Sequence, residues 1–374
     1  MHLLMFIKVK LIVMKKIDRL VPASALILAA ISSLFFLLNN CTQKEPSSGS
    51  YEQRLLEQAS VFFRPMPDNA FVDGERASDE LIELGKMLYY EPRLSRSGLI
   101  SCHTCHNFGL AGVDNLPVSV GHLWRKGPRN SPTVLNAALH SSQFHDGREP
   151  DVESQALMPI LDSVEMASSE EHVIEVLTSI PEYAEKFKNA FPGESDPVKY
   201  ENVGIAIGAF ERILLTYSRF DSFIKGDLNA LTNQEMEGLE TFMRVGCITC
   251  HVRETIGGQT FAKFITPAEL SGDTEPDLGR FDVTGREEDK HFFKVPSLLN
   301  VVETYPYFHD GSEWSLSNSI REVAMSQLDT ELTEPELESL VSFMHALSGE
   351  VPLYAREIPE LPPSTKDTPR PILD

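Results

Sequence analysis

The chain has 374 residues, of which 42% are hydrophobic, 24% charged and 9% aromatic. This length and composition favour about two domains with a sizeable core, and they exclude a disordered chain, a collagen-like chain and a multi-span membrane protein. The formal net charge is −22 and no long basic run offsets it, so no nucleic-acid partner is expected.

The N-terminus has the pattern of an export signal. Basic residues precede an apolar stretch from Leu20 to Leu38, as in a signal peptide. The stretch is also long enough to span a bilayer, so an uncleaved anchor is the alternative. Cys41 then precedes a polar, Ser-rich segment, which resembles the start of a bacterial lipoprotein. We predict a signal peptide over residues 1–40, a linker over residues 41–60 and a periplasmic or other extracytoplasmic protein, with lipidation of Cys41 and a lipid anchor as options.

Two copies of the motif Cys-x-x-Cys-His follow. They consist of Cys102, Cys105 and His106, and of Cys247, Cys250 and His251. This spacing is typical of c-type haem attachment, in which two thiols form thioethers with the haem and the His becomes an iron ligand. Disulfides are the alternative in an exported protein, and a zinc site would need further Cys or His at finger spacing. We predict two covalently bound haem c groups.

An internal repeat surrounds these motifs. Pro-Thr-Val-Leu-Asn at 132–136 recurs as Pro-Ser-Leu-Leu-Asn at 296–300, and Phe-His-Asp-Gly at 144–147 recurs at 308–311. Both pairs have an offset of 164 residues. Together with Cys-x-x-Cys-His, these are three motifs that occur twice in the same order, which predicts two homologous haem domains.

The local signals are helical. Capping boxes at Ser168, Thr232 and Thr333 open periodic apolar runs, and the last of these runs ends at Gly349. Pro181 marks another helix start. Alternating strand patterns are scarce.

The predicted fold is therefore mostly α, with two cytochrome c-like domains that each hold one covalently attached haem c. The N-terminal haem domain is predicted at residues 61–225. The C-terminal haem domain, with a C-terminal tail, is predicted at residues 226–374.

Several stretches resemble those of the bacterial di-haem cytochrome c peroxidases, a family that includes the MauG-like enzymes. The resemblance runs from about Leu84 to Gly349, and its signatures are residues 84–88, 127–130, 132–136, 279–281, 293–297 and 306–312. It implies reduction of hydrogen peroxide to water with electrons from a small redox protein, such as a cytochrome c or a cupredoxin. Electrons would enter at the C-terminal haem and pass to an N-terminal peroxidatic haem. A homodimer is an option.

Two other functions are carried as alternatives. One is a non-enzymatic di-haem electron carrier in which both irons have two protein ligands. The other is an oxidase that modifies a partner protein in the manner of MauG.

The second ligand of each iron decides what that haem does. Met344 and His345 lie inside the apolar C-terminal helix and are expected to pack there. Met325 lies just before that helix and fits the family position, so we expect ligation by His251 and Met325, which would make this haem the electron reservoir. A Tyr in place of Met325 would indicate MauG-like chemistry.

The resemblance also implies a peroxide site at the N-terminal haem. His122 matches a ligand that binds the oxidised iron and leaves when the partner haem is reduced. Glu165 and Gln155 match the acidic and amide residues of the peroxide pocket. A buried carboxylate can move a proton between the peroxide oxygens, and burial shifts its pKa toward neutrality. Gln155 would orient the peroxide by hydrogen bonding.

Two further expectations come from the resemblance. Asn130 and the backbone carbonyls of Thr304 and Pro306 match a calcium site, and neutral oxygen ligands suit this hard cation. His145 departs from the family, in which a Trp often stands at this position between the haems. Electron transfer through an indole is therefore not expected here.

Overall fold

The computed structural model describes residues 49–72 and 74–373. The chain divides into two units, Met1–Arg54 and Leu55–Asp374. The first contributes the start of helix α3 (Tyr51–Ala59) to the described part. The predicted signal peptide and Cys41 lie outside the described residues. Within the part that is described, no helix is long and apolar enough to cross a bilayer.

The fold is mostly α, as predicted. Two short strands, β1 (Phe261–Lys263) and β2 (Phe292–Lys294), pair antiparallel with Ala262 opposite Phe293. The helices after α3 are α4 (Asp79–Tyr90), α5 (Cys102–Cys105), α6 (Val152–Leu161), α7 (Glu170–Thr178), α8 (Pro181–Ala190), α9 (Tyr200–Glu211), α10 (Arg219–Ile224), α11 (Asn233–Val245), α12 (Pro267–Ser271), α13 (Phe281–Thr284), α14 (Leu316–Leu328), α15 (Glu334–Ala346) and α16 (Leu353–Arg356).

Three of the predicted helix starts are confirmed. Thr232 and Thr333 cap α11 and α15 with complete capping boxes. In each box the Thr side chain accepts a hydrogen bond from the backbone N–H of the third helical residue, and the side chain of that residue, a Glu, accepts one from the Thr backbone N–H. Pro181 is the first residue of α8, where its missing N–H costs no hydrogen bond.

Two helix ends differ from the prediction. Helix α7 is capped by Ser169, whose hydroxyl accepts from the backbone N–H of His172 at 3.2 Å. Ser168 instead donates its backbone N–H to the carbonyl of Ile160, so it belongs to the preceding turn. Helix α15 ends at Ala346, before the predicted end at Gly349.

Apolar side chains of the larger unit form two hydrophobic cores. The first core lies among α4, α6, α7, α8 and α9, and Cys102 packs against it. The second core lies among α10, α11, α14 and α15, and Cys247 packs against it. Each Cys-x-x-Cys-His motif therefore lies beside its own core.

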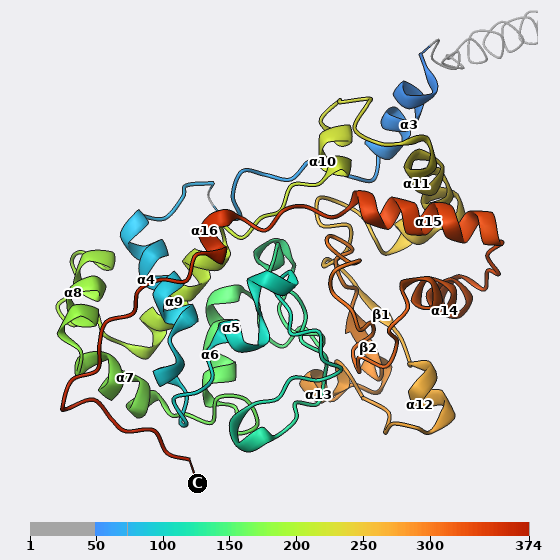
Figure 1. Ribbon diagram of the computed structural model, residues 1–374. Helices are drawn as coiled ribbons and strands as arrows, with labels where there is room; N and C mark the ends of the chain where they lie inside the picture. Colours follow the sequence, from blue (N-terminus) through green and yellow to red (C-terminus); the bar gives the residue numbers. More distant parts are fainter. Residues whose placement is uncertain (1–48, 73, 374) are drawn as a thin grey trace, which may run out of the picture. The chain divides into compact units, whose positions relative to one another are not determined.

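The two cores interleave along the chain. Phe63 and Phe220 belong to the second core although they precede residue 226, and Ala355 near the C-terminus belongs to the first. The Tyr90 hydroxyl donates to the carbonyl of Ala355 at 2.7 Å, and Figure 1 shows the red C-terminal segment with α16 beside α4 and α9. The two hydrophobic cores are therefore not divided at the predicted domain boundary between residues 225 and 226.

The repeated Pro-x-x-Leu-Asn motif occupies equivalent places in the two halves. Asn136 and Asn300 both adopt left-handed backbones, with φ of 62° and 60°. Their backbone N–H groups donate to the carbonyls of Leu214 and Leu347, which follow α9 and α15. Their side-chain amides both donate to the buried hydroxyl of Thr216 at 2.9 Å. The sequence repeat is therefore also a structural repeat, and its two copies meet at the hydroxyl of Thr216.

Replacing Thr216 with Val should destabilise this junction. Val preserves the shape but removes the acceptor, so two buried amides each lose a hydrogen bond at a cost of about 1–3 kcal/mol. We expect Thr216→Val to lower the free energy of unfolding by about 2–4 kcal/mol in urea titrations. Thr178→Val is the control, because that exposed hydroxyl bonds only the carbonyls of its own helix. Equal midpoints for the two variants would show that the junction contributes nothing.

Candidate active site

Each Cys-x-x-Cys-His motif lies on a short helical turn. Cys102 and Cys105 begin and end α5, and Cys247 opens the 3-10 turn η5 (Cys247–Thr249) directly after α11. None of the four motif cysteines forms a disulfide. Residues three apart on a helical turn lie on the same side, as attachment of both thiols to one ring requires.

The two motif histidines are held in the same way. The Nδ1 of His106 lies 3.3 Å from the carbonyl of Gly112, and the Nδ1 of His251 lies 3.0 Å from the carbonyl of Ile256. Because a carbonyl can only accept, Nδ1 carries the proton and Nε2 keeps its lone pair. Burial lowers the pKa of both rings and favours their neutral form. This is the arrangement of a metal-ligating imidazole, so both motifs fit a haem.

His122 and Glu165 are adjacent. His122 lies in the 3-10 turn η3 (His122–Trp124), and its backbone N–H donates to the carbonyl of Glu165 at 2.7 Å. Only glycine fits at position 121, since a Cβ there would collide with the backbone of Val164 and Glu165. The His122 side chain is 3% exposed, and its Nδ1 has no hydrogen-bond partner among the described residues. A buried ring nitrogen without a partner is consistent with a ligand of a bound group.

The carboxyl of Glu165 can exchange a proton near neutral pH. Burial raises its pKa to about 7, nearby Asp162 adds to the rise, and Arg148 opposes it. The carboxyl is close to the first haem motif, because its charge contributes to the raised pKa values of Cys102 and Cys105, which are due mainly to burial. Its position and its pKa thus suit a proton shuttle beside this motif.

Gln155 lies on α6 and is half-buried. A turn follows α6 and returns the chain toward the end of this helix. In it the backbone N–H of Met166 donates to the carbonyl of Pro159, and the backbone N–H of Glu165 donates to the carbonyl of Asp162. The same segment therefore carries Gln155 and Glu165. No hydrogen bond within the described ranges joins their side chains, and the role of Gln155 stays a prediction.

Glu211 is a second buried carboxyl near the first motif that the sequence did not single out. It ends α9 and is 3% exposed. Burial raises its pKa to about 8, the nearby Glu153 adds to the rise, and Arg212 opposes it. Its charge also contributes to the raised pKa of Cys102. The only signal in the sequence is a carboxylate that directly follows the apolar run 203–210 of this helix.

Met325 lies near the end of α14, the helix that directly precedes the C-terminal helix α15. Its side chain is 48% exposed, whereas the neighbouring Ala324 is buried in the second core. Ligation of the C-terminal iron by Met325 stays a prediction. Met344 packs in the second core, as expected, and His345 on the same helix is exposed.

The three residues of the predicted calcium site lie in one neighbourhood. The Asn130 amide donates to the carbonyl of Leu116 at 2.9 Å. The neighbouring Asn115 amide donates to the carbonyl of Tyr305 at 2.6 Å, between Thr304 and Pro306. No cluster of three or more His, Cys, Asp or Glu suited to a metal occurs in residues 49–72 and 74–373, so any calcium site there needs neutral oxygens.

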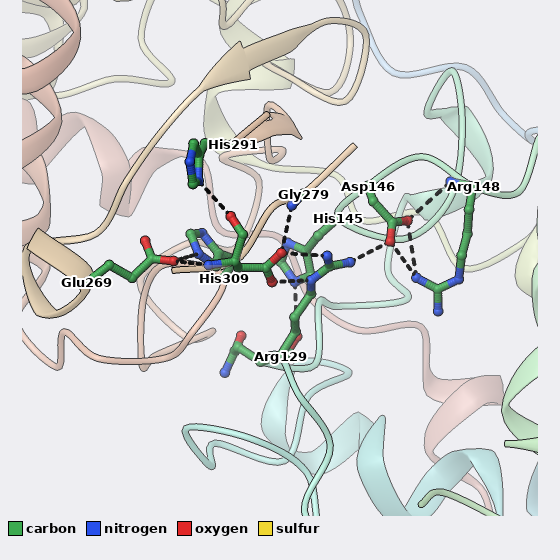
Figure 2. A network of polar contacts seen from close by, with 10 residues as sticks. Arg129, His145, Asp146, Arg148, Glu269, Gly279, His291 and His309 are labelled. Atoms are coloured by element: carbon green, nitrogen blue, oxygen red, sulfur yellow. Dashed lines mark hydrogen bonds and ion pairs between the residues drawn. The ribbon is translucent and has the colours of Figure 1, made fainter. Parts of the chain in front are cut away.

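A network of charges joins the first repeat to the second half of the chain (Figure 2). The Arg129 guanidinium donates to both carboxylate oxygens of Asp277 at 2.6 and 2.8 Å, and to Asp146 at 2.5 Å. Asp146 also accepts from Arg148 at 2.9 Å. Arg129 is largely buried, so this network is shielded from water. Residues 127–130 carried the family resemblance, but they did not reveal this role.

The two repeated histidines have different partners (Figure 2). The Nε2 of His145 lies 2.9 Å from the carbonyl of Asn130. Burial lowers the pKa of His145 to about 4; the charge of Arg129 adds to this shift, and the hydrogen bond to the Asn130 carbonyl opposes it. His145 is therefore a neutral donor. His309 stacks on Phe293 at 4.0 Å and contacts Glu269. Contacts therefore fix the orientation of both histidine rings.

Comparison with known proteins gives one consistent family. A family model described as di-haem cytochrome c peroxidase matches residues 79–229. Cytochrome c551 peroxidase of Pseudomonas aeruginosa is 45% identical over 85% of this chain and 92% of its own length, and that of Nitrosomonas europaea is 44% identical over 78% and 86%. A solved MauG-like protein associated with microbial copper homeostasis shares the fold, with a TM-score of 0.69 and 26% identity over 79% of this chain and 97% of that one. The chain belongs to the di-haem cytochrome c peroxidase family, which implies two haem cofactors.

Proposed function

We propose that this protein reduces hydrogen peroxide to water with electrons from a small redox protein, such as a cytochrome c or a cupredoxin. The observation that carries the proposal is half-buried Glu165: burial raises the pKa of its carboxyl to about 7, its backbone carbonyl accepts from buried His122, and its charge acts on the first Cys-x-x-Cys-His motif. An electron carrier needs no such proton-exchanging group. The relatives named peroxidases, at 44–45% identity, favour the same function.

The proposed roles of the chain's residues follow from their geometry. Two thiols of each motif would attach a haem, and the free Nε2 of His106 and His251 would ligate the iron. The haems, when bound, supply single electrons and an iron site for peroxide. Electrons would enter at the C-terminal haem and pass to the N-terminal one. The division at residues 61–225 and 226–374 would separate the two haem motifs, while segments around Phe63, Phe220 and Ala355 pack with the other half.

Glu165 would move the proton that peroxide reduction requires. Two electrons and two protons convert one peroxide into two water molecules. The ionised carboxylate would accept the proton of one peroxide oxygen and return it to the other oxygen, which would then leave as water. Gln155 would hold the peroxide by hydrogen bonding.

His122 would be the displaceable ligand. Its removal should open the N-terminal iron without prior reduction, so His122→Ala is expected to give a high-spin haem in the fully oxidised protein and activity without reductive activation. The measurements are electron paramagnetic resonance and peroxide consumption. His345→Ala is the control, because His345 is exposed. Low-spin signals from both haems in His122→Ala would contradict this role.

The function itself is tested by steady-state peroxide consumption with reduced cytochrome c, before and after half-reduction of the holoprotein. We expect oxidation of two cytochrome c molecules per peroxide, with the rate rising after half-reduction. Electron exchange with cytochrome c but no peroxide consumption would identify a carrier instead.

We further propose a calcium site formed by Asn130 and the carbonyls of Thr304 and Pro306, and a location outside the cytoplasm. The nearness of the segments around Asn115 and Asn130 supports the calcium site. Calorimetric titration should show one calcium per chain and weaker binding by Asn130→Ala.

A further inference from the structure

Lys294 joins the two halves of the chain through its ammonium group. It ends β2, and its Nζ donates to the carbonyl of Ser142 at 2.6 Å and lies 3.5 Å from the Nδ1 of His140. Its backbone N–H donates to the carbonyl of His145 at 2.7 Å. Burial lowers the pKa of Lys294 to about 8, and the charge of Asp146 opposes this shift. The surroundings of the ammonium therefore disfavour its charge.

No carboxylate of the described residues pairs with this ammonium, whose bonding partners are neutral. The carboxylate of Asp146 acts on it only from a distance, because Asp146 is bonded by Arg129 at 2.5 Å and by Arg148 at 2.9 Å. A charge that is taken out of water is ordinarily paired, since an unpaired one costs several kcal/mol. The expected partner of Lys294 is therefore an anion other than a side chain of the described part.

His140 adds a second donor beside Lys294. Burial lowers the pKa of His140 well below its usual value and the charge of Lys294 adds to this shift, so the ring is neutral. Because an ammonium can only donate, Nδ1 accepts and the ring proton is on Nε2. This Nε2 is buried and has no hydrogen-bond partner within residues 49–72 and 74–373. A buried N–H without an acceptor also indicates a missing partner.

Both side chains lie near the second Cys-x-x-Cys-His motif. A Cβ at Gly258 would come within 2.3 Å of the His140 ring, so this ring packs against the backbone that follows His251. Burial lowers the pKa of His251, and the carbonyl of Pro296 is one of two that oppose this shift, so it lies close to the His251 ring. Pro296 follows Lys294 by two residues. The motif imidazole and the ammonium are thus held by the same short segment.

We infer that Lys294 and the Nε2–H of His140 bind a carboxylate side chain of the haem attached at the second motif. Haem carries two carboxylates, so it supplies the anion that the described residues lack. The pairing holds the haem at the junction of the two halves. A positive charge beside the haem favours the reduced iron, so Lys294 raises the potential of the haem where electrons enter. This inference rests on the proposed haem attachment and electron entry, and it deepens them.

The test measures both haem potentials of the holoprotein by potentiometry and the haem carboxylate bands by resonance Raman spectroscopy. Lys294→Met removes the charge, so we expect a lower potential for one haem and a shifted carboxylate band. Lys294→Arg keeps the charge and should retain the wild-type potentials. Lys263→Met is the matched control, because Lys263 is exposed at the end of the neighbouring strand β1. Unchanged potentials and bands in Lys294→Met, with both haems attached, would overturn the inference.

Two measurements on the wild type complete the test. Titration with acetate should leave both potentials unchanged, whereas an acetate effect that Lys294→Met abolishes would show that Lys294 holds a free anion instead. Nitrogen-15 NMR decides the matter if Lys294→Met fails to fold. The Lys294 ammonium signal, identified by its loss in Lys294→Arg, should shift when the haems are reduced, and an unshifted signal would contradict the pairing.

Failure of the proposed function looks different from failure of this inference. The predicted changes in potential and carboxylate band without any peroxide turnover would remove the peroxidase activity and leave the pairing with Lys294 intact.

Discussion

Glu165→Gln is expected to cut peroxide turnover by about 10²–10⁴-fold, which is the usual contribution of general acid–base catalysis. Gln keeps the shape of the side chain but has no titratable proton. Haem content and both reduction potentials should stay unchanged. Glu185→Gln on the exposed side of α8 is the matched control and should retain wild-type turnover.

The pH dependence of turnover gives a second readout. Burial raises the pKa of Glu165 to about 7, so its ionised fraction grows as the pH rises through 7. Wild-type turnover should therefore rise between about pH 6 and 8, and this limb should be missing from Glu165→Gln. Rapid mixing of peroxide with the half-reduced variant separates chemistry from stability. A wild-type rate in that experiment would remove Glu165 from the mechanism.

Arg129→Met is expected to lower the free energy of unfolding by about 3–5 kcal/mol, because it leaves the largely buried carboxylate of Asp277 without its charged partner and leaves Asp146 with Arg148 alone. Asp146 and Asp277 both bond the Arg129 guanidinium. Arg286→Met is the control, since its pair with Asp289 is exposed on the arginine side and such pairs contribute about 0–1 kcal/mol. Similar urea midpoints for the two variants would contradict a structural role of the network.

The pKa of Asp277 decides how the loss of stability in Arg129→Met depends on pH. Burial raises this pKa, but the hydrogen bonds and charge of Arg129 outweigh burial and lower it below its usual value. A lowered carboxyl pKa stabilises the fold above the unfolded pKa, and this contribution is lost as the pH falls through the folded pKa. In Arg129→Met the largest opposing contribution is lost and burial is opposed mainly by the backbone N–H of Gly279, so the penalty for that variant should be larger at pH 7 than at pH 4.

The local features of the fold could be predicted from the sequence. Capping boxes at Thr232 and Thr333 and the proline at 181 each act within one helical turn, so the residues that decide them are neighbours in the chain. The repeat was also visible, because its motifs recur at a fixed offset. The exact start of α7 was missed because two serines compete for one cap, and the backbone bond of Ser168 to Ile160 decides it.

The site was predictable only in part. The Cys-x-x-Cys-His motifs carry their own chemistry, and the family resemblance placed His122 and Glu165 in one pocket, where the structure also has them adjacent. Contacts between distant segments left no local signal. Arg129 meets a carboxylate 148 residues away, and Glu211 reaches the first motif through the packing of α9. Ligation by Met325 stays a prediction, because it rests on the residue type and the family position and no contact among the described residues tests it.

A single-turnover reaction tests the central claim most directly. The fully reduced holoprotein is mixed without oxygen with one equivalent of hydrogen peroxide, and haem oxidation and residual peroxide are followed together. Two haems that act as one catalytic unit should both be oxidised, with one peroxide consumed and no radical product released. Peroxide that persists beside two reduced haems, or consumption that oxidises only one haem per chain, would contradict a di-haem peroxidase.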